Sequence, residues 1–337
     1  MTMQDNHKNS IDPRSFISAR VHDGYKTIVD SYSRKLKLYM FHEDLTNSIL
    51  PWQGYAEKDF QFNVTREEDG RTSKLADIIV YNLPADFKGC NTYTSYITGF
   101  IRKTVNEMFT FGEAFYEIKC ERNKNDSIVK FGVAPIYPPS MHCIFGMYFQ
   151  FIPKRVAEAY HIRREVRRIP KDQIMHITPP KQLGGKRSLQ RIIKRIALLD
   201  DKDNTIHRFF LYDRRNININ TTHLLTYLGI AKVTRLYGWD QRKHLSHEHN
   251  TLEYYEVYRS IMAAKASAYL REAIVEQLNQ TLNNRYLHTG LKISVTGLHT
   301  VSDTNALMVE LSKNNKKNFS NIWKRGFVQT ASDKAKE

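Results

Sequence analysis

The feature that most constrains the fold is a change of hydrophobic period in the first half of the chain. Over Tyr93–Thr110 the apolar residues recur every three or four positions, which predicts an amphipathic helix. Over Ala114–Cys120 and Ser127–Ala134 apolar and polar residues alternate on either side of a polar turn, which predicts a β-hairpin. A chain that carries both periods belongs to a mixed class, and we expect an α+β fold.

Helical patterns continue through the second half of the chain. The pair Gly184-Gly185 precedes an apolar pattern that runs to about Leu211, and Ser188 is the expected N-cap of this helix. The longest helical pattern covers Thr251–Leu282. Other expected helices cover Tyr25–Ile49, His223–Tyr237 and Ser302–Leu311, the last capped by Ser302 or Asp303, and other expected strands cover Met147–Ile152, Gln173–Thr178 and Leu291–Val295.

The charge balance favours a polyanionic partner. The 337 residues include 51 Lys and Arg against 35 Asp and Glu, a formal net charge of +16. Such an excess predicts attraction to nucleic acid, although a basic solvated surface is the alternative. The polar segment Lys154–Arg168, with Arg163, Arg164, Arg167 and Arg168, is expected to be exposed.

Neither a membrane span nor a disulfide framework is expected. No apolar run approaches the ~18–20 residues that a transmembrane helix needs, and Met1–Arg20 lacks the apolar core of a secretory signal. Cys90, Cys120 and Cys143 are odd in number and widely spaced, which is typical of reduced intracellular thiols.

Catalytic signatures are sparse. His244, His247 and His249 lie in a charged segment, and we interpret them as a solvated loop; a metal site is the alternative. The segment Gly184–Ser188 lacks the order of a phosphate-binding loop, although a helix start with two glycines and two cations could hold a phosphate.

Two further histidines lie in apolar surroundings. His142 and Cys143 are expected to be a packed core pair rather than a base and its nucleophile. His176, in the short strand Gln173–Thr178, is expected to be a structural histidine. We therefore expect no enzyme activity, no metal site and no cofactor.

Several short motifs occur in a distinctive order. Thr110–Ile118 enters the hairpin, Ala134–Pro138 leaves it, and Ile169–Ile177 leads to a glycine-rich helix start at Gly185–Leu189. The long helix then ends at Asn283-Asn284, followed by the strand Leu291–Val295 and by Ser302-Asp303. In this order of elements the chain resembles the portal proteins of tailed bacteriophages, as a short member of that family.

The resemblance implies a non-catalytic assembly. It implies a portal-like fold with long stem helices and a mixed α/β wing, assembled as a homo-oligomeric ring, usually a dodecamer, at one capsid vertex of the virion. Double-stranded DNA would pass through the ring, which would dock the packaging terminase, the major capsid protein and later tail or neck adaptor proteins. The protein would be in the host cytoplasm during assembly.

The implied domains follow the chain. They are a wing domain at 1–187, a first stem helix at 188–212, a clip and connecting segment at 213–250, a long second stem or wing helix at 251–284 and a C-terminal wing segment at 285–337. Whether His223–Tyr237 or Thr251–Leu282 returns along the stem is open, and length favours the second.

Two groups of residues fit this hypothesis. The DNA-facing candidates, for which a solvated helix face is the alternative, are Lys186, Arg187, Arg191, Lys194 and Arg195. The candidates for contact with a neighbouring subunit are Tyr254, Tyr255, Tyr258 and Tyr269. The competing functions are a basic, non-catalytic nucleic-acid-binding accessory protein of replication or recombination and a metal-dependent enzyme centred on the histidine loop.

Overall fold

The computed structural model shows a mixed α+β chain. It describes residues 9–12, 15–22, 36–50, 60–66, 74–85, 92–159, 161–162, 166–212, 219–239 and 253–313, with the backbone alone at 36, 159, 201–212, 219–225 and 253. The chain divides into two compact units. The first, here the sheet unit, comprises Met1–Ser31, Gln61–Thr178 and Ala273–Thr296, and the second, the helical unit, comprises Tyr32–Phe60, Pro179–Glu272 and Gly297–Glu337.

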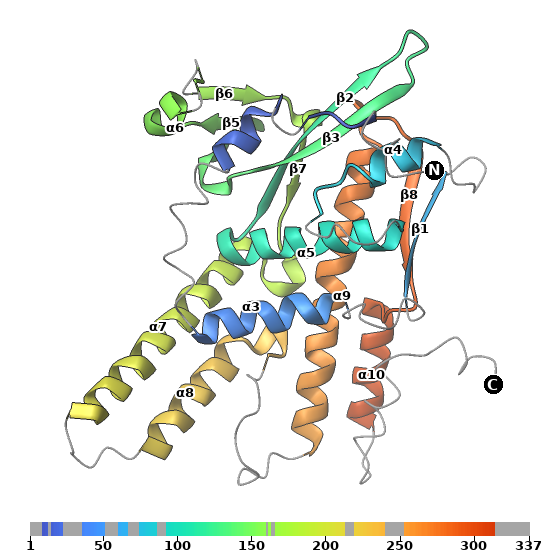
Figure 1. Cartoon of the computed structure of the whole chain (residues 1–337). Coiled ribbons are helices and arrows are strands. Elements are labelled where there is room, and N and C mark those ends of the chain that lie inside the picture. Colours follow the sequence, from blue (N-terminus) through green and yellow to red (C-terminus); the bar gives the residue numbers. More distant parts are fainter. Residues whose placement is uncertain are drawn as a thin grey trace. The chain divides into compact units, whose positions relative to one another are not determined.

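The predicted hairpin is the centre of the sheet unit. Strand β2 (Ala114–Arg122) pairs with β3 (Ile128–Ile136) and, on its other side, with β7 (Ile174–Ile177), both antiparallel. Figure 1 shows the long β2–β3 hairpin extending beyond β7. The apolar side chains of these strands are largely buried. The first five residues of β2 are all buried, so both faces of this strand are covered there, whereas a strict alternation predicts one buried face.

Helix α5 (Tyr93–Phe111) confirms the change of period. Thr92 caps its first turn by accepting a hydrogen bond from the Ser95 N–H, and the helix ends at Gly112, whose φ of 89° suits a residue without a side chain. Its buried face lies on β2, where the Thr104 and Tyr116 hydroxyls are 2.9 Å apart. The amphipathic helix and the hairpin thus share one core.

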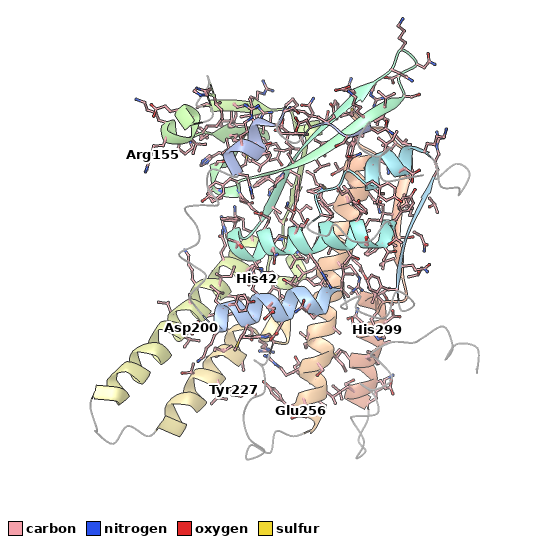
Figure 2. The ribbon with its side chains drawn as sticks, viewed as in Figure 1. His42, Arg155, Asp200, Tyr227, Glu256 and His299 are labelled. Atoms are coloured by element: carbon pink, nitrogen blue, oxygen red, sulfur yellow. The ribbon has the colours of Figure 1, made fainter. Side chains whose placement is uncertain are left out.

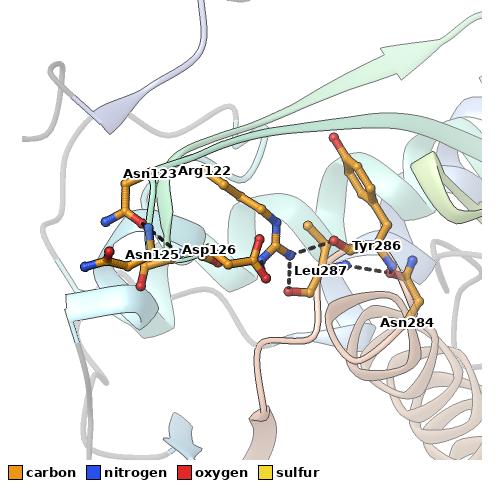
Figure 3. Close-up of polar contacts among 8 residues, drawn as sticks. Arg122, Asn123, Asn125, Asp126, Asn284, Tyr286 and Leu287 are labelled. Carbon is orange, nitrogen blue, oxygen red and sulfur yellow. Dashed lines mark hydrogen bonds and ion pairs between the residues drawn. The ribbon is translucent and has the colours of Figure 1, made fainter.

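The outer end of the hairpin is hydrogen-bonded to the segment that follows α9 (Glu253–Leu282). The residues of α9 from Ala273 onward, and this segment, belong to the sheet unit. The Arg122 guanidinium donates to the carbonyl oxygens of Tyr286 and Leu287, at 2.8 and 3.0 Å (Figure 3). The Asn284 side-chain oxygen accepts the backbone N–H groups of the same two residues. These polar bonds hold the outer end of the hairpin to this segment.

Two smaller sheets complete this unit. Strands β1 (Gln61–Arg66) and β8 (Leu291–Thr296) form an antiparallel pair. The small sheet consists of β4 (Met141–Ile144), β5 (Met147–Phe151) and β6 (Val166–Ile169), all antiparallel, with α6 (Lys154–Ala159) between β5 and β6. The expectation that Lys154–Arg168 is exposed is right only in part: Lys154, Arg155, Glu158 and Arg168 are exposed, whereas Val156 and Ala157 are buried.

Arg167 is the clearest correction within that segment. Its guanidinium forms a two-pronged ion pair with Glu117, a β2 residue that is 1% exposed. The Ser18 hydroxyl donates to the same carboxylate at 2.5 Å. A buried carboxylate needs such partners, so Arg167 faces inward. Arg168, on the opposite side of the strand, is exposed as expected, whereas Arg163 and Arg164 lie outside the described residues.

In the helical unit, α7 (Gly185–Tyr212) and α8 (Ile219–Val233) lie side by side and antiparallel (Figure 1). A Cβ added at Gly229 would be in van der Waals contact with the Leu199 methyl groups, so the two helices approach closely there. Helix α7 begins at Gly185, and Ser188 lies inside its first turn, so the prediction that Ser188 is the N-cap was wrong.

Helix α3 (Leu36–Ile49) packs on α7 through a capping carboxylate. The Oδ2 atom of Asp200, a buried α7 residue, accepts the backbone N–H of Lys37 at 2.8 Å (Figure 2). A carboxylate at a helix N-terminus satisfies a free N–H and opposes the helix dipole. The part of the predicted helix Tyr25–Ile49 that precedes residue 36 lies outside the described residues.

The other part of this unit consists of α9, up to Glu272, and α10 (Val301–Lys313). The N-terminus of α10 is capped by Thr300 and Asp303. The Asp303 carboxylate accepts the Thr300 N–H, and the Thr300 hydroxyl accepts the Asp303 N–H. The cap is therefore Thr300 with Asp303 three residues later, rather than Ser302 or Asp303 alone.

Candidate nucleic-acid interface

One face of α7 carries a continuous set of exposed cations. Successive spacings of four, three and one residues place them on one side of the helix, and the opposite side, with Leu189 and Ile196, is fully buried. The members of this basic face are Arg187, Arg191, Lys194 and Arg195. The same amphipathic pattern that buries one side of α7 therefore places the four cations together on the opposite side.

No carboxylate of a described residue neutralises the basic face. The sequence has no Asp or Glu between Asp172 and Asp200, and none of the four cations forms an ion pair with a described residue. Mutual repulsion of like charges on adjacent helical turns is slightly destabilising. A polyanion would relieve that repulsion, because phosphates bring the missing negative charge.

Lys186 does not belong to this face. It is half-buried, lies on another side of α7 and has an interaction elsewhere in the chain. Sequence reasoning selected it because cations adjacent in the sequence look alike, whereas on a helix neighbouring residues point about 100° apart. The structure thus groups four of the five DNA-facing candidates and separates the fifth.

The tyrosine candidates of α9 are mostly used within the chain. Tyr258 packs on the apolar cluster of Val257, Ile261 and Leu311, and Tyr254 stacks on Tyr258 with ring centroids 6.5 Å apart. Tyr254 is exposed, and Tyr258 is half-buried.

The other two tyrosine candidates each lie near a cation of the same helix. The Arg259 guanidinium is 6.0 Å from the centroid of the Tyr255 ring, and the Lys265 ammonium is 5.9 Å from that of Tyr269. Both rings are half-buried. Of the four candidates, Tyr254 therefore presents the most surface to a neighbour.

Sequence reasoning missed the buried arginines of α9. The Arg259 guanidinium donates to the carbonyl oxygens of Ala231 and Trp239, which joins α9 to the end of α8. Burial lowers the pKa of Arg271 to about 10, although Glu272 opposes the shift. Arg271 donates to the carbonyl oxygens of Ile49 and His299. Both arginines satisfy backbone carbonyl oxygens of other segments. A helical pattern in the sequence does not predict such a role.

The histidines of the sheet unit do not form a catalytic site. His142 and Cys143 are both exposed and point to opposite faces of β4, so the prediction of a packed core pair was wrong. The His176 Nε2 is 3.0 Å from a carboxylate oxygen of Glu113, and its ring stacks on Phe115 at 4.1 Å. His176 is therefore satisfied within the fold, as expected.

In the part of the chain that the structure describes, no three His, Cys, Asp or Glu side chains converge on one point. His244, His247 and His249 lie outside that part. No described helix is both long and apolar enough to cross a membrane.

Comparison of the sequence with models of known protein families, and with curated proteins, gives no match. The fold is α+β, and its most distinctive surface is the basic face of α7, whose four cations form no ion pair with a described residue.

Proposed function

We propose that this protein is a bacteriophage portal, a homo-oligomeric ring whose central channel conducts double-stranded DNA at one capsid vertex. The observation that carries the proposal is the basic face of α7, which lies on an antiparallel helix pair and has no carboxylate among the described residues to neutralise it. Repeated around a ring, such a face attracts the phosphates of any sequence without fixing one register.

The α7–α8 pair supports one choice between the two possible stem partners. Helix α8 follows α7 directly and runs antiparallel to it, with Gly229 at the point of contact with Leu199. We assign α7 and α8 as the two stem helices and 213–218 as the clip. Helix α8 thus takes the place of Thr251–Leu282, which its length had favoured as the second stem helix. In this assignment α9 is a wing helix.

The proposed role needs no catalytic residue, metal or cofactor. The partners are the packaging terminase, the major capsid protein and the tail or neck adaptors, and the location is the virion vertex after assembly in the host cytoplasm. A ring uses heterologous contacts, in which two different surfaces of each subunit meet. Tyr254 is the tyrosine candidate most available for such a contact.

The first test is the oligomeric state of the purified chain. Mass photometry and negative-stain imaging are expected to show closed rings. A monomer or dimer at every salt concentration would overturn the proposal. If that monomer bound short duplexes tightly, the alternative, a nucleic-acid-binding accessory protein, would take its place.

The second test removes the charge of the basic face. The variant Arg187→Gln, Arg191→Gln, Lys194→Gln and Arg195→Gln is expected to form rings but to bind duplex DNA with a weaker dependence on salt. Each phosphate that the variant no longer neutralises reduces the steepness of the log–log slope by about 0.9. The matched control replaces Lys124, Lys171, Arg285 and Lys292, four exposed cations of the sheet unit, by Gln. Equal slopes for both variants would show that α7 does not face DNA.

A further inference from the structure

Exposed cations of the helical unit also occur at the end of α8. Lys232, in the last turn of α8, and Arg235, in the short helix Arg235–Tyr237 that follows it, are both exposed and are here called the second row. Neither forms an ion pair with a described residue. The sequence has no Asp or Glu between Asp213 and Asp240. The end of α8 therefore matches the start of α7 in carrying cations and no carboxylate.

Two contacts between α7 and the α8 segment place the second row beside the basic face. Gly229 lies against the methyl groups of Leu199, and a Cβ on Gly184 would be 3.7 Å from a methyl group of Leu236. Along the α8 segment, the second row lies between these two contacts, and along α7 the basic face also lies between them. Because the helices are antiparallel, the two sets of cations therefore run side by side (Figure 1).

Both sets of cations face the same side of the helix pair. In the winding direction of α8, the contact residue Gly229 lies about 60° beyond Lys232, at 3.6 residues per turn. On α7, the contact residue Leu199 lies about 80° beyond Arg191 and about 40° beyond Arg195 in the same direction. In two antiparallel helices, the same sense of rotation from the exposed residue to the contact places the exposed residues on one side of the pair. One partner can therefore reach both sets.

The separation of the two sets indicates a polyanion with two strands. Packed helices have axes about 8–10 Å apart. The grooves of a DNA duplex are about 6 and 12 Å wide, and each is bordered by a phosphate chain on either side. Two parallel sets of cations at this separation can bind both phosphate chains that border one groove, whereas a single strand has only one such chain.

The carboxylates of a second copy are a poorer match than phosphates. Among the described residues the exposed carboxylates are scattered, and no helix or strand carries more than two of them. Helix α10 carries two, but Asp303 caps its own helix, and Glu310 has the exposed cation Lys313 one turn further on. Two parallel sets of cations are complemented better by the closely and regularly spaced charges of a nucleic acid.

We propose that Lys232 and Arg235 are phosphate-binding residues, and that α7 and α8 together bind the two strands of a DNA duplex across one groove. The inference rests on the proposed function in taking DNA as the partner of the basic face. It adds the residues of α8 and a preference for a double strand. Both sets of cations belong to one chain, so a single subunit outside a ring would bind in the same way.

The test uses the full chain, a short DNA duplex and a single strand of the same length, with binding measured by fluorescence anisotropy at a series of salt concentrations. Lys232→Gln with Arg235→Gln should make the log–log salt slope for the duplex less steep by about 1.8, which is about 0.9 for each lost phosphate contact. The slope for the single strand should change little, because that strand can follow α7 alone. Lys124→Gln with Lys171→Gln, an equal change of charge in the sheet unit, is the control and should leave both slopes unchanged.

Two results would overturn the proposal directly. An unchanged duplex slope in the Lys232→Gln and Arg235→Gln variant would show that α8 does not contact phosphates. An equal change for the duplex and the single strand would show that the two sets of cations do not span a groove. Failure of the wild-type chain to form rings, with the slopes as expected, would affect only the proposed function. Absence of duplex binding by the wild-type chain would overturn this inference together with the role of the basic face.

A lipid surface is a further possible outcome of the test, because Leu198, Leu228 and Leu236 are exposed on the same segments. Vesicles of phosphatidylglycerol and phosphatidylcholine are therefore tested in parallel. Vesicle binding that the Lys232→Gln and Arg235→Gln variant loses, while its duplex slope stays that of the wild type, would overturn the proposal and identify a lipid surface.

Discussion

The Arg167 guanidinium and the Glu117 carboxylate form a two-pronged ion pair that joins the small sheet to the central strand β2. Removal of the arginine would leave a buried carboxylate with only Ser18 as a side-chain hydrogen-bond partner among the described residues. Arg167→Ala should therefore lower the free energy of unfolding by about 3–5 kcal/mol. Arg168→Ala, at the exposed neighbouring position, should change it by at most about 0.5 kcal/mol. Urea unfolding measures both, and equal effects would contradict a structural role for the pair.

Gly238 has a φ of 63° and lies against the backbone of α9, so that a Cβ there would overlap the Arg259 and Ala263 backbone atoms. Gly238→Ala is expected to cost about 2–5 kcal/mol, from left-handed strain together with overpacking. Gly146→Ala introduces the same left-handed strain, but its Cβ would meet no other atom, so it should cost about 1–2 kcal/mol. Thermal unfolding followed by circular dichroism compares them. A similar loss at both positions would show that α9 shifts freely.

Asp200 caps α3, and Asp200→Ala should cost about 1–2 kcal/mol because the partly buried Lys37 N–H loses its acceptor. Hydrogen exchange of the first turn of α3 should accelerate in this variant. Leu198→Ala, an exposed position on α7, serves as the control and should leave exchange of α3 unchanged. Unaltered protection in Asp200→Ala would show that the cap is not needed.

The Gln150 side chain is fully buried on the inner face of the small sheet, and neither its oxygen nor its nitrogen has a hydrogen-bond partner among the described residues. A buried unpaired amide is costly. Gln150→Met, similar in size, should therefore raise the free energy of unfolding by about 1–3 kcal/mol. Chemical denaturation measures the change. A destabilised variant would show that the amide binds a group essential to the fold.

Burial lowers the pKa of His299 below its ordinary value of 6.5, Asp303 opposes the shift, and Arg271 adds to it. The unfolded chain then binds a proton more readily than the folded chain. Stability is therefore fully present above pH 6.5 and is lost as the pH falls from there through the folded pKa. His299→Gln should flatten this loss in urea unfolding at a series of pH values. An equally steep loss of stability below pH 6.5 in His299→Gln would contradict the contribution of this histidine.

The elements that the sequence predicted well have long, regular patterns. Helix α5 and the β2–β3 hairpin were predicted within two residues at each end, and α9 and β8 similarly. Strand β1 was missed because six residues of mixed polarity give no clear alternation, and its partner β8 lies more than 220 residues further along the chain. Strands β4 and β6 have only four residues each, too few for a period to be recognised, whereas the equally short β7 was predicted because its apolar run lies between Pro170 and Pro179.

The candidate site was predictable in composition but not in detail. The cations of α7 could be selected from the sequence, because no acidic residue interrupts them. Their exposure depended on the exact phase of the helix, which separated Lys186 from the rest. The pairing of Arg167 with Glu117 could not be foreseen, because residues 50 apart in the chain meet only after the strands have formed.

Because no Asp or Glu lies between Asp172 and Asp200, the stability of α7 depends on the anions in the surrounding solution. A helix that repels itself is stabilised by whichever anions gather at its surface, and multivalent anions gather most strongly. Phosphate or sulfate buffers should therefore raise the melting temperature of the purified protein more than chloride at equal ionic strength.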